Sequence, residues 1–224
     1  MKLQKDVFWK AAILTAVVFI LGVLLGYYIE SGRLTEIEEE YKKVELQWAD
    51  AKLQTLYYQT LSPDLCKAAI EENLKFSDKV YEEGLKLEEY EEANKLGADK
   101  FSLDKKRYSL LKVEFLLNSL FLKEKCKSAN YTNLVYFYAS DPTDNQELQQ
   151  IAISEILKQL KQKQGSSLML IPLPIDLDIS VINVINKAYN VNSIPTILIN
   201  EKIKIEGVKT IEEIEKAIED AKKS

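Results

Sequence analysis

The first pattern in the chain is an uncharged, apolar run near the N-terminus. Residues 11–29 have the sequence AAILTAVVFILGVLLGYYI, close to the about 20 residues that cross about 30 Å of hydrocarbon as a helix. Trp9 precedes the run and Tyr27 and Tyr28 end it, where aromatic rings favour the membrane interface. The residues that follow lack the small-x-small pattern of a signal-peptide cleavage site. We therefore expect a retained transmembrane helix over 11–29.

The charges around this run predict its orientation. All lysines before the run lie close to it, within residues 1–10, whereas the cations after it lie among glutamates. By the positive-inside rule, residues 1–10 form a short cytoplasmic tail, and the protein is a single-pass cell-membrane protein with its C-terminal part outside the cytoplasm. Gly22 and Gly26 form a GxxxG pair that would let two such helices pack as a homodimer.

Residues 30–60 continue with a helical pattern that predicts a stalk. Apolar or small residues recur in alternating steps of three and four, the spacing of a heptad seam. Two interpretations fit: a coiled coil with a second chain, which would also give a homodimer, or docking onto the next helices of the same chain, which we favour. The seam positions are Leu34, Ile37, Tyr41, Val44, Trp48, Ala51, Thr55 and Tyr58.

Residues 61–130 are predicted to form a helical hairpin. Ser62 is a good N-cap and Pro63 suits the first helical position, so a helix is expected to start there. Gly97 should end it, and a second helix is expected over 102–126.

The chain has two cysteines, and the hairpin predicts how they are arranged. Cys66 and Cys126 lie at nearly equal distances along the chain from Gly97, so an antiparallel hairpin places them side by side. In an oxidising compartment this geometry predicts a disulfide. The alternative is two free, buried cysteines that act as small hydrophobic residues.

From Thr132 the pattern changes to that of an α/β domain over 131–224. Buried-strand runs alternate with amphipathic helices, which gives the order β-α-β-α-β-β-α. The first two strands are parallel because a helix connects them, and Asn200-Glu201 makes a tight reversal between the last two. The first helix is expected to bury one face made of Leu148, Ile151, Ala152, Ile156, Leu157 and Leu160.

Composition excludes several kinds of chemistry. Thirty Lys and Arg against thirty-five Asp and Glu give a net charge of −5, so no basic field exists to bind nucleic acid. There is no histidine, which removes Ser-His and Cys-His nucleophile pairs and most zinc sites. The glycine-rich dinucleotide and nucleotide motifs are missing too, so no cofactor and no metal are expected.

The C-terminal element order, together with the stretch Tyr189-Asn190-Val191-Asn192-Ser193-Ile194-Pro195-Thr196, resembles the thioredoxin-like superfamily over residues 131–222. The resemblance implies a thioredoxin-like fold and a cis proline, Pro195, that faces the active site. An anchor, a helical region with two cysteines and such a domain also resemble archaeal envelope proteins.

The chain departs from that superfamily at its redox motif. Redox members place Cys-x-x-Cys after the first strand, where the helix N-terminus lowers the pKa of the leading thiol. Here that place is taken by Ser140-Asp141-Pro142-Thr143-Asp144, so both expected thiols are aspartates. Asp141 as N-cap, with Pro142 next and Asp144 in the first turn, makes a sound helix start. A site for a cation or a basic peptide is the functional alternative.

Two functional hypotheses follow. The first is a redox-inactive module, without catalytic residues, that binds a protein or peptide segment. Its expected peptide-binding residues are Asp141, Pro142, Asp144, Ile194 and Pro195.

The second hypothesis is a thiol-disulfide oxidoreductase or isomerase that uses Cys66 and Cys126. The two cysteines lack a visible pKa-lowering setting, except that Cys66 lies four residues after the expected Ser62 N-cap, and this weakens the hypothesis. Separately, Asn130-Tyr131-Thr132 is a glycosylation sequon, a tripeptide that often arises by chance.

Overall fold

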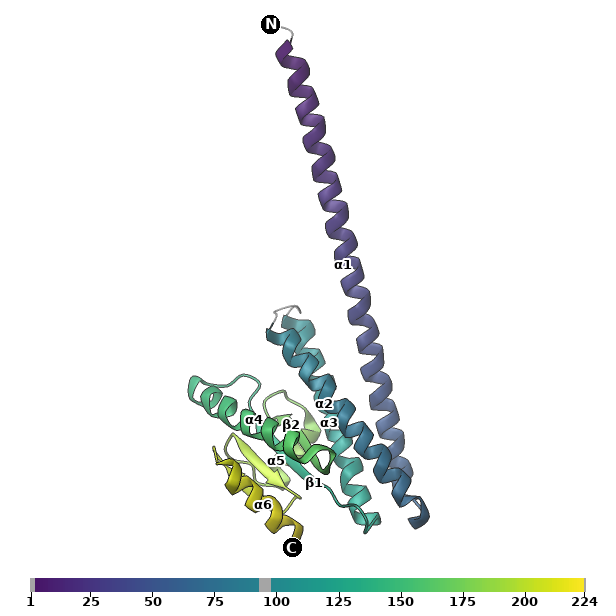
Figure 1. Ribbon diagram of the computed structural model, residues 1–224, viewed down its shortest axis with the longest axis vertical. Helices are drawn as coiled ribbons and strands as arrows, with labels where there is room; N and C mark the ends of the chain where they lie inside the picture. Colours follow the sequence, from purple (N-terminus) through teal and green to yellow (C-terminus); the bar gives the residue numbers. More distant parts are fainter. Residues whose placement is uncertain (1–2, 93–97, 224) are drawn as a thin grey trace. The chain divides into compact units, whose positions relative to one another are not determined.

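The computed structural model describes residues 3–92 and 98–223. The chain divides into two units, Met1–Leu46 and Gln47–Ser224. Figure 1 follows the chain from the purple N-terminus to the yellow C-terminus.

The first unit is helical over residues 3–46. It belongs to α1 (Leu3–Tyr58), which runs through the expected junction of anchor and stalk without a break. Within α1, Val7–Ile29 is long and apolar enough to cross a membrane, and its side chains are exposed. This segment includes the whole of the run 11–29.

The C-terminal end of α1 docks within the second unit. Ala51, Thr55 and Tyr58 are buried. The Thr55 hydroxyl donates to Asn118 Oδ1 at 2.6 Å, and Asn118 Nδ2 donates to the Ala51 carbonyl at 3.1 Å. These seam positions therefore contact the same chain, as the intramolecular interpretation expects. The side chains of Leu34, Ile37, Tyr41 and Val44 lie outside the described ones, and a coiled coil remains a prediction.

A short 3-10 turn, η1 (Pro63–Leu65), leads into α2 (Cys66–Glu92), and α3 (Ala98–Lys125) returns beside it. Phe76 and Phe115 meet edge to face across the pair, with ring centres 5.7 Å apart. The predicted stop at Gly97 lies outside the described residues.

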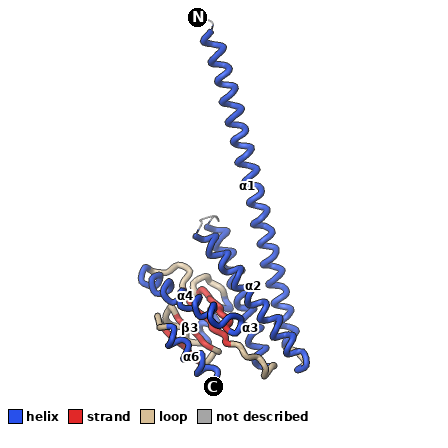
Figure 2. Tube along the Cα trace, viewed as in Figure 1, coloured by secondary structure: helices blue, strands red, loops and turns tan. Residues whose placement is uncertain are grey.

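The α/β part has the predicted element order, with a four-stranded mixed sheet of order β2-β1-β3-β4. β1 pairs parallel with β2 and antiparallel with β3, and β3 pairs antiparallel with β4 across the Asn200-Glu201 turn. Figure 2 separates these strands in red from the helices in blue. The elements are β1 (Thr132–Tyr138), α4 (Asp144–Gln164), η2 (Gly165–Ser167), β2 (Leu168–Pro174), α5 (Ser180–Ala188), β3 (Thr196–Ile199), β4 (Ile203–Glu206) and α6 (Ile211–Lys223).

Helices α4 and α6 cover one face of the sheet. Ile153 and Leu157 of α4 and Ile214 of α6 pack on Leu134 and Ile197. The predicted buried face of α4 is wrong in its first turns. Leu148, Ile151 and Ala152 are exposed, and Ile153 is buried instead. Ile153, Leu157 and Leu160 lie four and three residues apart, so they form a single, narrower apolar strip along the helix.

The helical hairpin packs on the other face of the sheet, through buried polar contacts. The Ser119 hydroxyl of α3 donates to Asn133 Oδ1 of β1 at 2.5 Å, and Asn73 Nδ2 of α2 lies 3.7 Å from Met169 Sδ of β2. All four residues are buried. Buried polar groups need such partners, so these contacts hold the hairpin in one position on the sheet.

Candidate functional site

Three loops lie at the same edge of the sheet, where β1 and β2 end and β3 begins. Tyr138 at the end of β1 pairs with Pro174 at the end of β2, and Phe137 pairs with Thr196 at the start of β3. The register therefore brings residues 139–143, 175–179 and 190–195 to the carboxyl ends of β1 and β2, where open α/β sheets bind ligands. The expected peptide-binding residues all lie at this edge: Asp141, Pro142, Asp144, Ile194 and Pro195.

The first loop is fixed by two side chains from outside it. Asp176 Oδ1 accepts a hydrogen bond from the Ser140 backbone N–H and Oδ2 accepts one from the Asp141 N–H, both at 2.8 Å. Gln150 accepts from the Ala139 N–H at 2.7 Å and donates to the Ala139 carbonyl at 3.1 Å. These hydrogen bonds therefore fix the backbone of the loop, although the loop lies on the surface.

Helix α3 also reaches this loop. Lys105 Nζ donates to Ser140 Oγ at 3.2 Å. Lys112, which is buried, lies with its Nζ 4.6 Å from the Tyr108 ring centre and 6.0 Å from that of Tyr138. The hairpin thus contributes two cations beside the loop.

The start of α4 differs from the sequence-based expectation. The N-cap is Thr143, not Asp141, and Pro142 precedes the helix. The Thr143 backbone N–H donates to Gln146 Oε1 at 3.0 Å, as in a capping box. Because the Asp141 N–H donates to Asp176, Asp141 stays outside the first turn of α4. Its side chain is exposed, as is that of Asp144.

The third loop carries the expected cis peptide bond, between Ile194 and Pro195. Pro195 is buried, and its carbonyl accepts from the Gly207 N–H at 2.8 Å. Ile194 is half-buried, and in the described part of the chain no hydrogen bond joins its N–H or C=O to another group. In the register of β1 with β3 its partner would be Ala139, whose backbone N–H and C=O are both bound by Gln150.

The chemistry available at this edge comes from exposed carboxylates and from the backbone of Ile194, with Lys105 and the buried Lys112 beside the first loop. Neither cysteine belongs to it. Among the described residues, no cluster of three or more His, Cys, Asp or Glu side chains could hold a metal ion. The edge can therefore offer exposed negative charge and one backbone N–H and C=O to a ligand.

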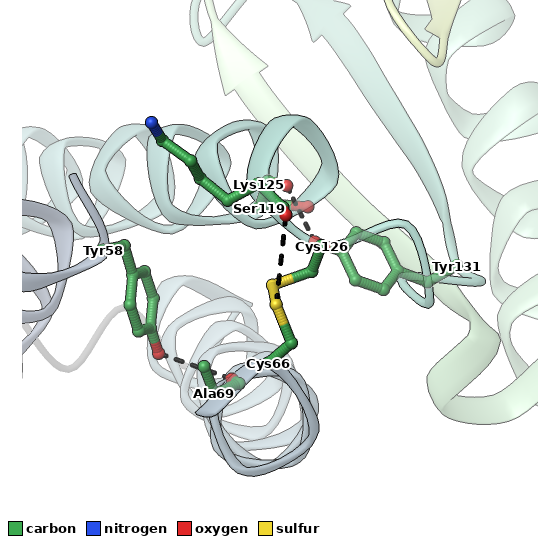
Figure 3. Close-up of a disulfide and its surroundings, with 7 residues drawn as sticks. All are labelled: Tyr58, Cys66, Ala69, Ser119, Lys125, Cys126 and Tyr131. Atoms are coloured by element: carbon green, nitrogen blue, oxygen red, sulfur yellow. Dashed lines mark hydrogen bonds between the residues drawn. A yellow bond between two sulfur atoms is a disulfide. The ribbon is translucent and has the colours of Figure 1, made fainter. Parts of the chain in front are cut away.

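The two cysteines form a disulfide at the other end of the hairpin, as the spacing predicts. Cys66 and Cys126 are bonded, with Cα atoms 5.6 Å apart. They are 8% and 2% exposed and pack with Tyr58, whose hydroxyl lies 3.4 Å from the Ala69 carbonyl. Burial, with the charges of Glu72 and Asp50, raises the pKa of Tyr58 to about 12. Figure 3 shows the bond between Cys66 and Cys126, with Tyr58, Ala69 and Tyr131 drawn near it.

Sequence reasoning missed the roles of Asp176 and Gln150. Asp176 and Asp178 follow β2, where a turn is the simplest interpretation of two aspartates, and Asp178 has the φ of 51° of a turn residue. Asp176 instead binds the neighbouring loop. Its place just after β2 is the available clue, because parallel strands end at the same edge.

The comparisons with known proteins assign no family to the chain. No protein-family model and no curated protein matches the chain. Among solved structures, chloroplastic thioredoxin z is 14% identical, covers 44% of this chain and 84% of its own, and has a TM-score of 0.34. A structure described as a malarial protein is 18% identical, covers 41% of this chain and 98% of its own, and has a TM-score of 0.31. The thioredoxin-like description therefore depends on the strand order and register.

Proposed function

We propose that this chain is a membrane-anchored binding module whose thioredoxin-like domain holds an extended polypeptide segment at the edge formed by Asp141, Pro142, Asp144, Ile194 and Pro195. The domain would lie outside the cytoplasm, anchored by the segment Val7–Ile29. The lysines before that segment support this orientation.

The unpaired backbone of Ile194 carries the proposal. A backbone N–H and C=O without partners beside a sheet can pair with an extended chain, as in β-strand addition. Because Gln150 binds the backbone N–H and C=O of Ala139, Ala139 does not pair with Ile194. The exposed carboxylates of Asp141 and Asp144 would favour a segment with basic residues.

The setting of the disulfide favours binding over thiol chemistry. A redox-active cysteine needs access and a lowered pKa. Cys66 and Cys126 are buried among Tyr58, Ala69 and Leu122. Oxidoreductase activity remains the alternative, and insulin reduction by the full chain would support it.

Binding of an unfolded polypeptide tests the proposal. The full chain in lipid nanodiscs is titrated against a fluorophore-labelled, carboxymethylated polypeptide that cannot fold, and anisotropy is recorded. We expect saturable binding that weakens at least about tenfold in Ile194→Asp, since a charge in a half-buried contact costs more than about 1.4 kcal/mol.

A matched variant separates this effect from a general loss of structure. Val184→Asp introduces the same charge at an exposed apolar position on α5, 65% exposed, and should leave binding unchanged. Equal affinity of Ile194→Asp and the parent chain would reject the site.

A further inference from the structure

The tripeptide Asn130-Tyr131-Thr132 joins α3 to β1 and plays no part in the proposed binding edge. It is the chain's single Asn-x-Ser/Thr sequon. Asn130 is exposed, whereas Tyr131 and Thr132 are buried. Tyr131 is also tied to the hairpin, because its hydroxyl donates to the Ser119 carbonyl at 2.7 Å.

The Thr132 hydroxyl makes no hydrogen bond in the described part of this fold. Its Oγ1 is completely buried and has no partner among the described residues. A buried hydroxyl without a partner destabilises a protein, and valine has the same shape and favours strands as well as threonine does. A threonine at this position therefore points to a need for the hydroxyl outside the folded state.

We propose that Asn130 is an N-glycosylation site, modified on the non-cytoplasmic side before the domain folds. This inference depends on the orientation proposed above and is independent of peptide binding. The Asn side chain is the acceptor and the Thr hydroxyl is the part of the sequon that the transferase requires.

The reaction takes its sugar from a lipid-pyrophosphate-linked oligosaccharide. A bond forms between Asn130 Nδ2 and the anomeric carbon of the first sugar, and the bond from that carbon to the phosphate oxygen breaks. The lipid pyrophosphate leaves with the electron pair, and the proton lost from Nδ2 passes to a base of the transferase.

The fold sets the order of events and the place of the glycan. Because Thr132 is 0% exposed and is the first residue of β1, its hydroxyl is accessible only before β1 pairs with β2. Asn130 precedes the amino end of β1, and the proposed peptide edge lies at the carboxyl end. A glycan on Asn130 is therefore placed away from Ile194 and compatible with a bound segment.

Mass spectrometry of the full chain from its own membranes tests the proposal directly. A peptide-N-glycosidase in ¹⁸O-water converts a glycosylated Asn to labelled Asp. We expect labelled conversion at position 130 and none at Asn145, which is exposed but followed by Gln146-Glu147. An unmodified Asn130 in that protein overturns the proposal.

Translation into microsomes then distinguishes the sequon from the orientation. Asn130→Gln and Thr132→Val should lose one glycan, and Thr132→Ser should keep it. In unglycosylated protein, Thr132→Val should melt no lower than the parent chain if the hydroxyl serves no structural role.

Glu147→Ser provides the matched control, because it creates a second acceptor at exposed Asn145 in the same domain. Modification of Asn145 without modification of Asn130 overturns the proposal and leaves the orientation intact. Modification of neither residue overturns both.

Discussion

Asp176 binds the backbone of Asp141 across two loops, with its Oδ2 2.8 Å from the Asp141 nitrogen. Its other oxygen binds the Ser140 N–H at the same distance. One carboxylate at the end of β2 thus fixes the loop that follows β1. In redox members of the superfamily that this domain resembles, the corresponding loop carries the reactive thiols.

Replacing that carboxylate should loosen the loop. Asp176→Asn keeps one acceptor oxygen but loses the charge, and charge-assisted bonds are worth about 1.5–3 kcal/mol each in buried settings and less on the surface. We expect faster amide exchange at Ser140 and Asp141 and a loss of global stability of no more than about 1 kcal/mol. Asp178→Asn, next but one in the chain, should leave exchange at both amides unchanged. Unaltered exchange in Asp176→Asn would contradict the assigned role.

The disulfide should behave as a structural bond. It closes a separation of 60 residues, for which the chain-entropy model gives roughly 4 kcal/mol. The double variant Cys66→Ser with Cys126→Ser should therefore unfold at a clearly lower urea concentration than the parent chain. In a glutathione series the parent bond should have a midpoint below about −300 mV. A midpoint near that of known oxidoreductases would support the enzymatic alternative.

Glu201 should make stability depend on pH. Burial raises the pKa of this carboxyl, although Lys123 nearby and the hydrogen bond from Asn133 Nδ2 at 3.2 Å both lower it. A folded pKa above the unfolded value of about 4.3 means that the folded state binds more protons between the two values, so stability falls as pH rises through that window.

Glu201→Gln tests this dependence because the amide can still accept the bond from Asn133. We expect the variant to be more stable than the parent chain at pH 7 and to lack this part of the decline in urea-unfolding free energy above about pH 4.3. Burial lowers the pKa of Lys123, and its Nζ donates to Asn200 Oδ1 beside Glu201. The same decline in variant and parent would show that Glu201 is not its source.

Much of this fold could be predicted because it follows from local patterns. The period change at Thr132 marks the α/β part, and the Asn200-Glu201 reversal joins two antiparallel strands, as expected. The pairing of Cys66 with Cys126 follows from their nearly equal spacing from the turn.

The features that could not be predicted depend on contacts distant in sequence. Ser119 meets Asn133 only because the hairpin packs on the sheet, and no local pattern contains that packing. The start of α4 offers several competing caps, and Thr143 becomes the N-cap while Asp176 binds the Asp141 amide. The unpaired N–H and C=O of Ile194 depend likewise on Gln150, whose side chain binds the backbone N–H and C=O of Ala139.

Amide exchange at Ile194 tests the central claim most directly. The full chain in nanodiscs is exchanged into deuterated buffer with and without the carboxymethylated polypeptide, and the fragment that contains Ile194 is followed. If the segment pairs with this backbone, the polypeptide should slow exchange at Ile194 and leave Val184 on α5 unchanged. Saturable binding with no added protection at Ile194 would contradict the account.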